Sequence, residues 1–242
     1  MTMHFLVLQH LNIEPPALIA DTLLSAGHTL TTVHLDQGDK LPESTDHIDG
    51  IIIMGGPQSA NDMHTSYICE EVTWLKQAID KGLPMLGICL GAQIMAKAAG
   101  AEIFPSPVRE LGWFPVYQTS TSEADPLFAL MPDGLMVFQW HGETFSLSKG
   151  MTVTATHPDV PAQAFRLGKA QYGIQFHIEV TEHMIEDWIT AGDSERQHLG
   201  DSGINKLRSQ TPEYILDMQN YCQQMTLAWL REVNVSQQNK GI

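Results

Sequence analysis

Residues 84–93 constrain the fold of this chain more than any other stretch. They begin with a short apolar run, pass through Gly87-Ile-Cys89-Leu-Gly91, and continue at once into a helix-forming segment. The glycines two residues before and two residues after Cys89 leave room for a cramped backbone, as in a nucleophile elbow with sulfur in place of a hydroxyl. The stretch therefore predicts a strand, a tight turn and a helix, with a thiol at the apex.

Such an elbow suits a nucleophile in two ways. It exposes the side chain above the sheet, and it places the sulfur at the N-terminus of the following helix, where the helix dipole and free N–H groups favour thiolate over thiol. The alternative is that Cys89 is an inert buried cysteine at a strand end, a common environment for free cysteine.

The first hundred residues alternate apolar strands with helices. Strands are expected at 5–8, 29–35, 50–54 and 85–88. A helix is expected at about 17–26, and another carries the amphipathic repeat of Ile68, Val72, Leu75 and Ile79. Apolar strands separated by helices predict a parallel sheet with both faces covered. We therefore expect an α/β fold with a doubly wound, mostly parallel, flavodoxin-like central sheet.

The pattern changes from about residue 101 to residue 176. Short β-rich segments separated by turn residues occur at 113–117, 136–140, 152–156, 162–166 and 172–176. No long helix is expected among them. We predict that these segments extend the sheet as an added region of antiparallel or mixed strands.

The C-terminal part is helical in pattern. One apolar stripe repeats at helical spacing and consists of Ile215, Met218, Cys222, Met225 and Trp229. Cys222 is therefore expected in the core. Thr211 followed by Pro212 predicts the start of this helix, and the polar, glycine-containing segment 193–201 predicts a loop. We expect a domain at 1–190 and a C-terminal helical extension at 191–242 that packs on the same domain.

Composition excludes several classes of protein. A net charge of −15, with only 13 Lys and Arg residues spread along the chain, argues against nucleic-acid binding. The three cysteines are widely spaced without a CxxC pattern, so neither a disulfide framework nor a zinc ribbon is supported. No basic n-region precedes the first apolar run, and no apolar stretch is long enough for a membrane span. We expect a soluble, cytoplasmic protein that acts on a small molecule.

A second informative stretch runs from Tyr172 to Thr181 and contains His177 and Glu179. At a strand end, residues i and i+2 point to the same side. A thiol nucleophile needs a base for its proton, and the base needs an acceptor on its other ring nitrogen, so His177 and Glu179 are candidates for these roles. The alternative is that His177 is simply a hydrogen-bonded surface residue. His10 is also placed to line a site, but the sequence identifies no partner for it.

A third stretch, Gly55-Gly56-Pro57, follows the strand expected at 50–54. Ligands of open α/β sheets bind at the carboxyl ends of the strands. The N–H groups of Gly56 and of Leu90, the residue after the thiol, could together bind a carbonyl oxygen that develops negative charge. The alternative is that these glycines form a plain turn.

These three stretches match, in order and spacing, the class I glutamine amidotransferase family. The resemblance covers about residues 45–185 and is strengthened by the segments 109–113 and 139–145, which are similar to the glutaminase part of GMP synthetase. It implies a triad in which Cys89 attacks the side-chain amide of glutamine, His177 protonates the departing ammonia, and Glu179 orients His177. Water then hydrolyses a γ-glutamyl thioester and releases glutamate.

The resemblance also implies roles for residues around the triad. Gly56 and Leu90 become the backbone donors of an oxyanion hole. Four further positions are expected to hold the α-amino and carboxylate groups of the substrate, namely Gln93, Trp140, Gly142 and Glu143. Many relatives have proline at the position of Ile178, which carries no reacting group. The chemistry needs no metal and no organic cofactor.

Three hypotheses about function remain open at this point. The first is a hydrolase of free glutamine, acting alone or with a separate synthetase subunit that accepts the ammonia. The second is a γ-glutamyl peptidase, because γ-glutamyl amides present the same γ-carbonyl and amino-acid head. The third is a binding or regulatory protein that keeps the fold without catalysis.

Overall fold

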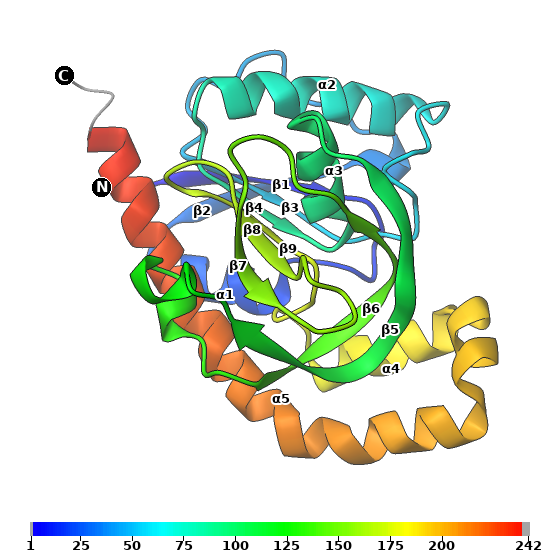
Figure 1. Cartoon of the computed structure of the whole chain (residues 1–242). Helices are drawn as coiled ribbons and strands as arrows, with labels where there is room; N and C mark the ends of the chain where they lie inside the picture. Colours follow the sequence, from blue (N-terminus) through cyan, green and yellow to red (C-terminus); the bar gives the residue numbers. More distant parts are fainter. Residues whose placement is uncertain (1, 239–242) are drawn as a thin grey trace.

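A computed structural model of the chain describes residues 2–238 (Figure 1). Its strands are β1 (His4–Gln9), β2 (Thr29–His34), β3 (Gly50–Ile53), β4 (Met85–Ile88), β5 (Ile103–Gln118), β6 (Leu135–Phe145), β7 (Thr152–Thr156), β8 (Ala164–Arg166) and β9 (Gln171–Ile174). Its helices are α1 (Ala17–Ser25), α2 (Ser66–Asp80), α3 (Leu90–Ala98), α4 (Glu182–Ala191) and α5 (Asp193–Gln238), with short 3-10 turns at Leu35–Gln37, Ser122–Ala124 and Phe128–Leu130.

The strands form one sheet in the order β2-β1-β3-β4-β9-β8-β7-β5-β6. The first five strands of this order pair in parallel, and β8, β7, β5 and β6 follow as antiparallel strands. This confirms the expected α/β fold with a mostly parallel centre and an added antiparallel region. The β5 and β6 strands are longer than the segments predicted at 113–117 and 136–140.

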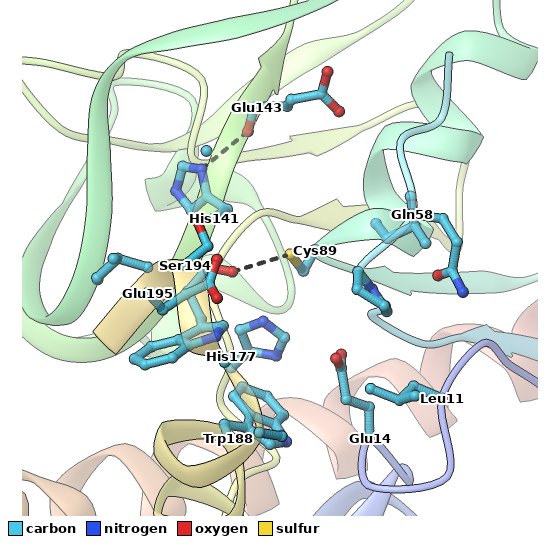
Figure 2. A pocket seen from close by; sticks show the side chains of 18 of the residues that line it. Leu11, Glu14, Gln58, Cys89, His141, Glu143, His177, Trp188, Ser194 and Glu195 are labelled. Carbon is cyan, nitrogen blue, oxygen red and sulfur yellow. Dashed lines mark hydrogen bonds between the residues drawn. The ribbon is translucent and has the colours of Figure 1, made fainter. Parts of the chain in front are cut away.

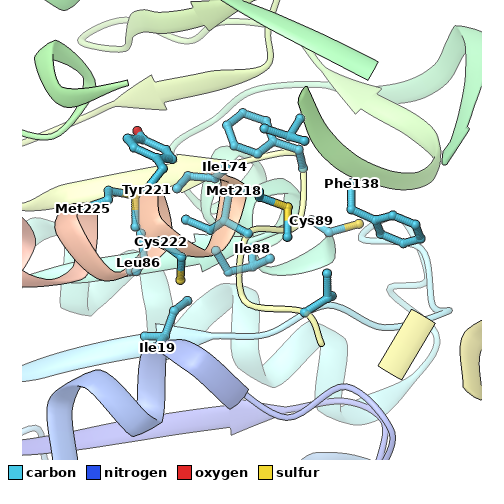
Figure 3. Close-up of a cluster of buried hydrophobic side chains, with 14 of the residues drawn as sticks. Ile19, Leu86, Ile88, Cys89, Phe138, Ile174, Met218, Tyr221, Cys222 and Met225 are labelled. Carbon is cyan, nitrogen blue, oxygen red and sulfur yellow. The ribbon is translucent and has the colours of Figure 1, made fainter. Parts of the chain in front are cut away.

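Alternate residues of the parallel strands belong to two hydrophobic cores, one on each face of the sheet. In β1, Phe5 and Val7 belong to the core that α1 and α5 cover, and Leu6 and Leu8 belong to the core that α2 and α3 cover. This alternation is expected for a strand buried on both faces. Figure 3 shows Cys222 of α5 within the first core, as its position on the apolar stripe predicts.

Two expectations for the C-terminal part were wrong. Segment 193–201 is helical rather than a loop, except at Gly200 (φ 62°, ψ 176°), where α5 is kinked between two helical parts. Leu199, within this segment, packs against the core. The helix also does not begin at Thr211. Its hydroxyl instead donates a hydrogen bond to the Leu207 carbonyl one turn earlier, and α5 continues through Pro212 to Gln238. The remainder of the C-terminus lies outside the described residues.

The β5–β6 pair curls back over the carboxyl ends of β4 and β9. The N–H of His177, just past β9, donates a hydrogen bond of 2.8 Å to the carbonyl of Phe138 in β6. This contact places residues 140–143 of β6 above the end of β4, where the cysteine elbow lies. Within residues 2–238, no helix combines the length and apolarity needed to cross a membrane.

Candidate active site

The elbow between β4 and α3 has the strained geometry that its glycines predict. Cys89 adopts φ 50° and ψ −108°, an unfavourable region for a residue with a side chain. A side chain on Gly91 would collide with the backbone carbonyl of Ile53 in β3, and a Cβ on Gly87 would lie 2.8 Å from the carbonyl oxygen of Gly91. Glycine at position 91 therefore lets the first turn of α3 pack directly against β3, and glycine at position 87 lets the same turn fold back close to β4.

His177 and Glu179 form a buried hydrogen-bonded pair beside this elbow. Nδ1 of His177 lies 2.7 Å from Oε1 of Glu179, and the two residues are 1% and 0% exposed. Burial lowers the pKa of His177, but the negative charges of Glu179 and Cys89 more than offset this and hold it well above its ordinary value. Cys89 and His177 line the same cavity. The Trp188 ring packs edge-on against the imidazole, with centroids 4.6 Å apart.

The sulfur lies near a group of β6 and near the residue that follows β9. Sγ of Cys89 is 3.9 Å from the carbonyl oxygen of Trp140 and 3.7 Å from Nε2 of Gln175. Cys89 is 7% exposed, and the small accessible part faces a cavity. The thiol is therefore sheltered by protein on most sides and open on one.

A cavity of about 780 Å³ collects nearly all the residues predicted for the site. Eight of the nine line it, namely Cys89, His177, Gly56, Leu90, Gln93, Trp140, Gly142 and Glu143. The ninth, Glu179, lies behind His177 and contacts its Nδ1. The Gly56 backbone sits against the Leu90 side chain, since an added Cβ would be 3.0 Å from Leu90 Cδ2. The structure thus brings the predicted residues together.

Gln93 makes contacts that its predicted substrate role does not include. Its side-chain nitrogen donates to the carbonyl of Glu143 at 3.0 Å and to Oε1 of Gln175 at 3.2 Å. Because these bonds tie α3 to the end of β6, Gln93 fixes the backbone at Glu143 as well as lining the cavity.

Glu14, which the sequence did not single out, lies in the loop after β1 and also lines the cavity (Figure 2). Its carboxylate packs against the backbone of Gly55, on the side where the His177 ring also lies. Burial raises the pKa of Glu14 to about 7, although the positive charges of His177 and His10 oppose this. The available signal was its position at the carboxyl end of a parallel strand, where ligands of such sheets bind.

The far wall of the cavity comes from β5 and the start of α5. There Arg109 forms an ion pair with Glu195 and a hydrogen bond of 3.1 Å with Ser194. Within residues 2–238, no group of three or more His, Cys, Asp or Glu side chains is arranged to hold a metal ion.

Comparison with known proteins shows which family the chain is similar to. The family model described as glutamine amidotransferase class-I matches residues 16–188. The chain belongs to the class I glutamine amidotransferase family. It is 31% identical over 195 residues to the glutamine amidotransferase-like protein YfeJ of Salmonella typhimurium, covering 78% of this chain and 80% of that relative.

Other members of the class I glutamine amidotransferase family differ in length. The GMP synthase of Porphyromonas gingivalis is 38% identical over 144 residues, which are 59% of this chain but only 27% of the synthase. A glutamine amidotransferase of Thermotoga maritima, known from a crystal structure, superposes with a TM-score of 0.85 at 26% identity, covering 96% of this chain and 99% of that one.

Proposed function

We propose that this class I glutamine amidotransferase hydrolyses the side-chain amide of glutamine through a thioester on Cys89. The observation that carries the proposal is that Cys89 and His177 line one cavity, while Glu179 lies behind His177 and is hydrogen-bonded to its Nδ1. A thiolate, a protonated imidazole and a buried carboxylate are the groups that acyl transfer from an amide requires.

In this mechanism the Cys89 thiolate attacks the γ-carbonyl carbon and forms a tetrahedral intermediate. The backbone N–H groups of Gly56 and Leu90 hold the oxyanion. His177 gives its proton to the amide nitrogen, which leaves as ammonia while the thioester forms. Neutral His177 then takes a proton from water, and the resulting attack releases glutamate and restores the thiolate.

Residues of the cavity walls beside Cys89 are candidates for binding the α-amino and carboxylate groups of the substrate. Trp140, Gly142 and Glu143 line the cavity on the β6 side, and Gln93 lies beside them. In the proposed complex these groups bind the α-amino and carboxylate ends and so hold the γ-carbonyl over Cys89. Fixing both ends of the substrate lowers the entropic part of the barrier.

The size of the cavity favours a second candidate, a γ-glutamyl peptidase. Its volume of about 780 Å³ falls within the range of roughly 300–1,000 Å³ that suits drug-sized ligands, and it is large for one glutamine molecule. The chemistry is the same, because only the amine that leaves differs.

The ammonia released from glutamine implies an acceptor, and we propose a separate synthetase subunit for this role. The support is by analogy. The GMP synthase relative is much longer than the matched region, so most of that enzyme lies outside the part that resembles this chain. A solved structure from Thermoplasma acidophilum, described as one subunit of a GMP synthase, shares the fold with a TM-score of 0.61 at 22% identity.

A substrate panel tests the proposal and separates the two candidates. The purified protein is incubated with glutamine and with γ-glutamyl peptides, and the release of glutamate, ammonia and amine is followed. Cys89→Ala is expected to abolish turnover, while Cys69→Ala, at a partly exposed cysteine on α2, retains it. Preference for peptides by more than about tenfold, about 1.4 kcal/mol in barrier, favours the peptidase. Undiminished turnover by Cys89→Ala contradicts both.

A further inference from the structure

The cavity is flanked by two more buried pairs of a histidine and a glutamate. Nε2 of His10 lies 2.8 Å from Oε2 of Glu71, and both residues are 0% exposed. Nε2 of His141 lies 2.9 Å from Oε2 of Glu110, which is also 0% exposed. Neither pair belongs to the proposed triad. Burying two carboxylates is costly unless each has a partner, so their placement beside the cavity requires a reason.

Hydrogen bonding fixes one proton of the His10 ring. Its Nδ1 lies 3.0 Å from the carbonyl oxygen of Met54 and 3.3 Å from that of Gly55. Carbonyl oxygens only accept, so Nδ1 carries hydrogen. The contact between Nε2 and the Glu71 carboxyl then needs a second proton, held by either partner. The pair is therefore neutral as a whole, which explains how Glu71 can lie on the buried face of α2 beside Ile68 and Leu75.

The same argument applies to His141, from a different strand. Its Nδ1 lies 2.9 Å from the carbonyl oxygen of Glu143, so this nitrogen also carries hydrogen. Its Nε2 shares a second proton with Glu110, the residue opposite it in the β5–β6 pairing. The Glu143 carbonyl thus receives two hydrogen bonds, from His141 and from Gln93.

Each pair holds a different wall of the cavity. Nδ1 of His10 donates to the carbonyls of Met54 and Gly55, the two residues directly before the Gly56 N–H. The Gly56 backbone also packs against the His10 side chain. His141 donates to the carbonyl of Glu143 and so holds the part of β6 that runs from Trp140 to Glu143. A rigid support of this kind is what keeps backbone donors aimed at a reacting atom.

We propose that the two pairs are positioning residues with separate duties, His10–Glu71 for the oxyanion-binding backbone at Gly56 and His141–Glu110 for the backbone that binds the substrate head. The inference rests on the proposed function. It predicts that damage to the first pair lowers kcat, because an oxyanion forms only during the reaction, and that damage to the second raises KM.

Paired variants test this division. Glu71→Met removes the partner of His10, and we expect kcat to fall tenfold or more while KM changes less than about threefold. Glu71→Gln can donate to a neutral His10 ring and is expected to recover most of the lost kcat. Glu110→Met is expected to raise KM tenfold or more. Glu110→Gln is not expected to rescue, because Oε2 of Glu110 accepts from both His141 and Gln163. Glu70→Gln, at an exposed neighbour of Glu71, serves as the control.

Double variants guard against misfolding, since replacing both partners of a buried pair by apolar residues is tolerated far better than removing one. His10→Leu with Glu71→Met is expected to fold and to lower kcat as Glu71→Met does. His141→Leu with Glu110→Met also removes the acceptor of the buried Gln163 amide, so it is expected to raise KM at a lower stability. Folded double variants with wild-type kcat and KM would overturn the proposal.

Amide hydrogen exchange gives a readout that needs no turnover. Peptides spanning 50–56 are expected to exchange tenfold or more faster only when the first pair is altered, and peptides spanning 135–145 only when the second is altered. If the wild-type protein cleaves no γ-glutamyl substrate, the proposed function fails while this measurement still decides the positioning. Unchanged exchange at both segments would overturn it.

Discussion

Replacing Glu14 by glutamine is expected to stabilise the protein above neutral pH more than in mild acid. Its carboxyl is partly buried and has its pKa raised from 4.5 to about 7. Below pH 4.5, the ordinary pKa of the carboxyl, Glu14 is protonated in both the folded and the unfolded chain. Between pH 4.5 and about pH 7, Glu14 ionises only in the unfolded chain, so the free energy of unfolding falls as the pH rises. Above about pH 7 this loss of stability is complete. At about 1.36 kcal/mol for each pH unit, the loss between about pH 5.5 and about pH 8 is about 2 kcal/mol.

Glutamine cannot ionise, so the Glu14→Gln variant escapes this loss. Urea unfolding at about pH 5.5 and about pH 8 measures the free energy of unfolding of the variant and of the wild type. Both pH values lie above the isoelectric point of about 5.0. Because Glu14 is partly exposed, we expect the stability gained by the variant to be larger at the higher pH by about 1–2 kcal/mol. Glu43→Gln, at an exposed loop carboxyl, is the matched control. A gain that is equal at the two pH values, or smaller at the higher one, would refute the reasoning.

Three further substitutions test other parts of the account. Glu179→Gln removes the charge that raises the pKa of His177, so kcat is expected to fall at least tenfold with little change in KM, and an unchanged pH profile would speak against the pair. Gly91→Ala pushes a methyl group into the Ile53 backbone and should lower unfolding free energy by about 1–3 kcal/mol or more, whereas full stability would mean that the elbow has room. Trp229→Ala empties a fully buried site and should cost about 3–5 kcal/mol in urea unfolding while the folded fraction keeps its kcat, and a loss under about 1 kcal/mol would contradict the packing.

The parallel half of the fold and the elbow were predictable because their signals are local. Apolar runs such as 50–54 and 85–88 mark buried strands, and the glycines around Cys89 mark a turn that other residues cannot form. His177 and Glu179 were predictable as a pair because residues two apart in extended backbone face the same side, although β9 itself ends at Ile174, before His177.

Other features depend on contacts between distant segments, which local patterns do not reveal. The bond between His177 and Phe138, which brings β6 over the elbow, joins residues far apart in sequence. Glu71 falls on the apolar face of α2, and nothing near it in sequence indicates that His10 neutralises it. The segment 193–201 is polar and its sequence predicts a loop, yet it is helical up to the kink at Gly200 and contacts distant parts of the chain through Leu199 on the core and through the bonds of Ser194 and Glu195 to Arg109.

In the proposed mechanism Cys89 carries the acyl group during turnover. Mass spectrometry of acid-quenched protein, taken while it turns over its best γ-glutamyl substrate, tests this directly. We predict a γ-glutamyl adduct that maps to the peptide containing Cys89, is absent from Cys89→Ala and persists in Cys69→Ala. Turnover with no adduct at Cys89, or an adduct that remains in Cys89→Ala, would contradict it.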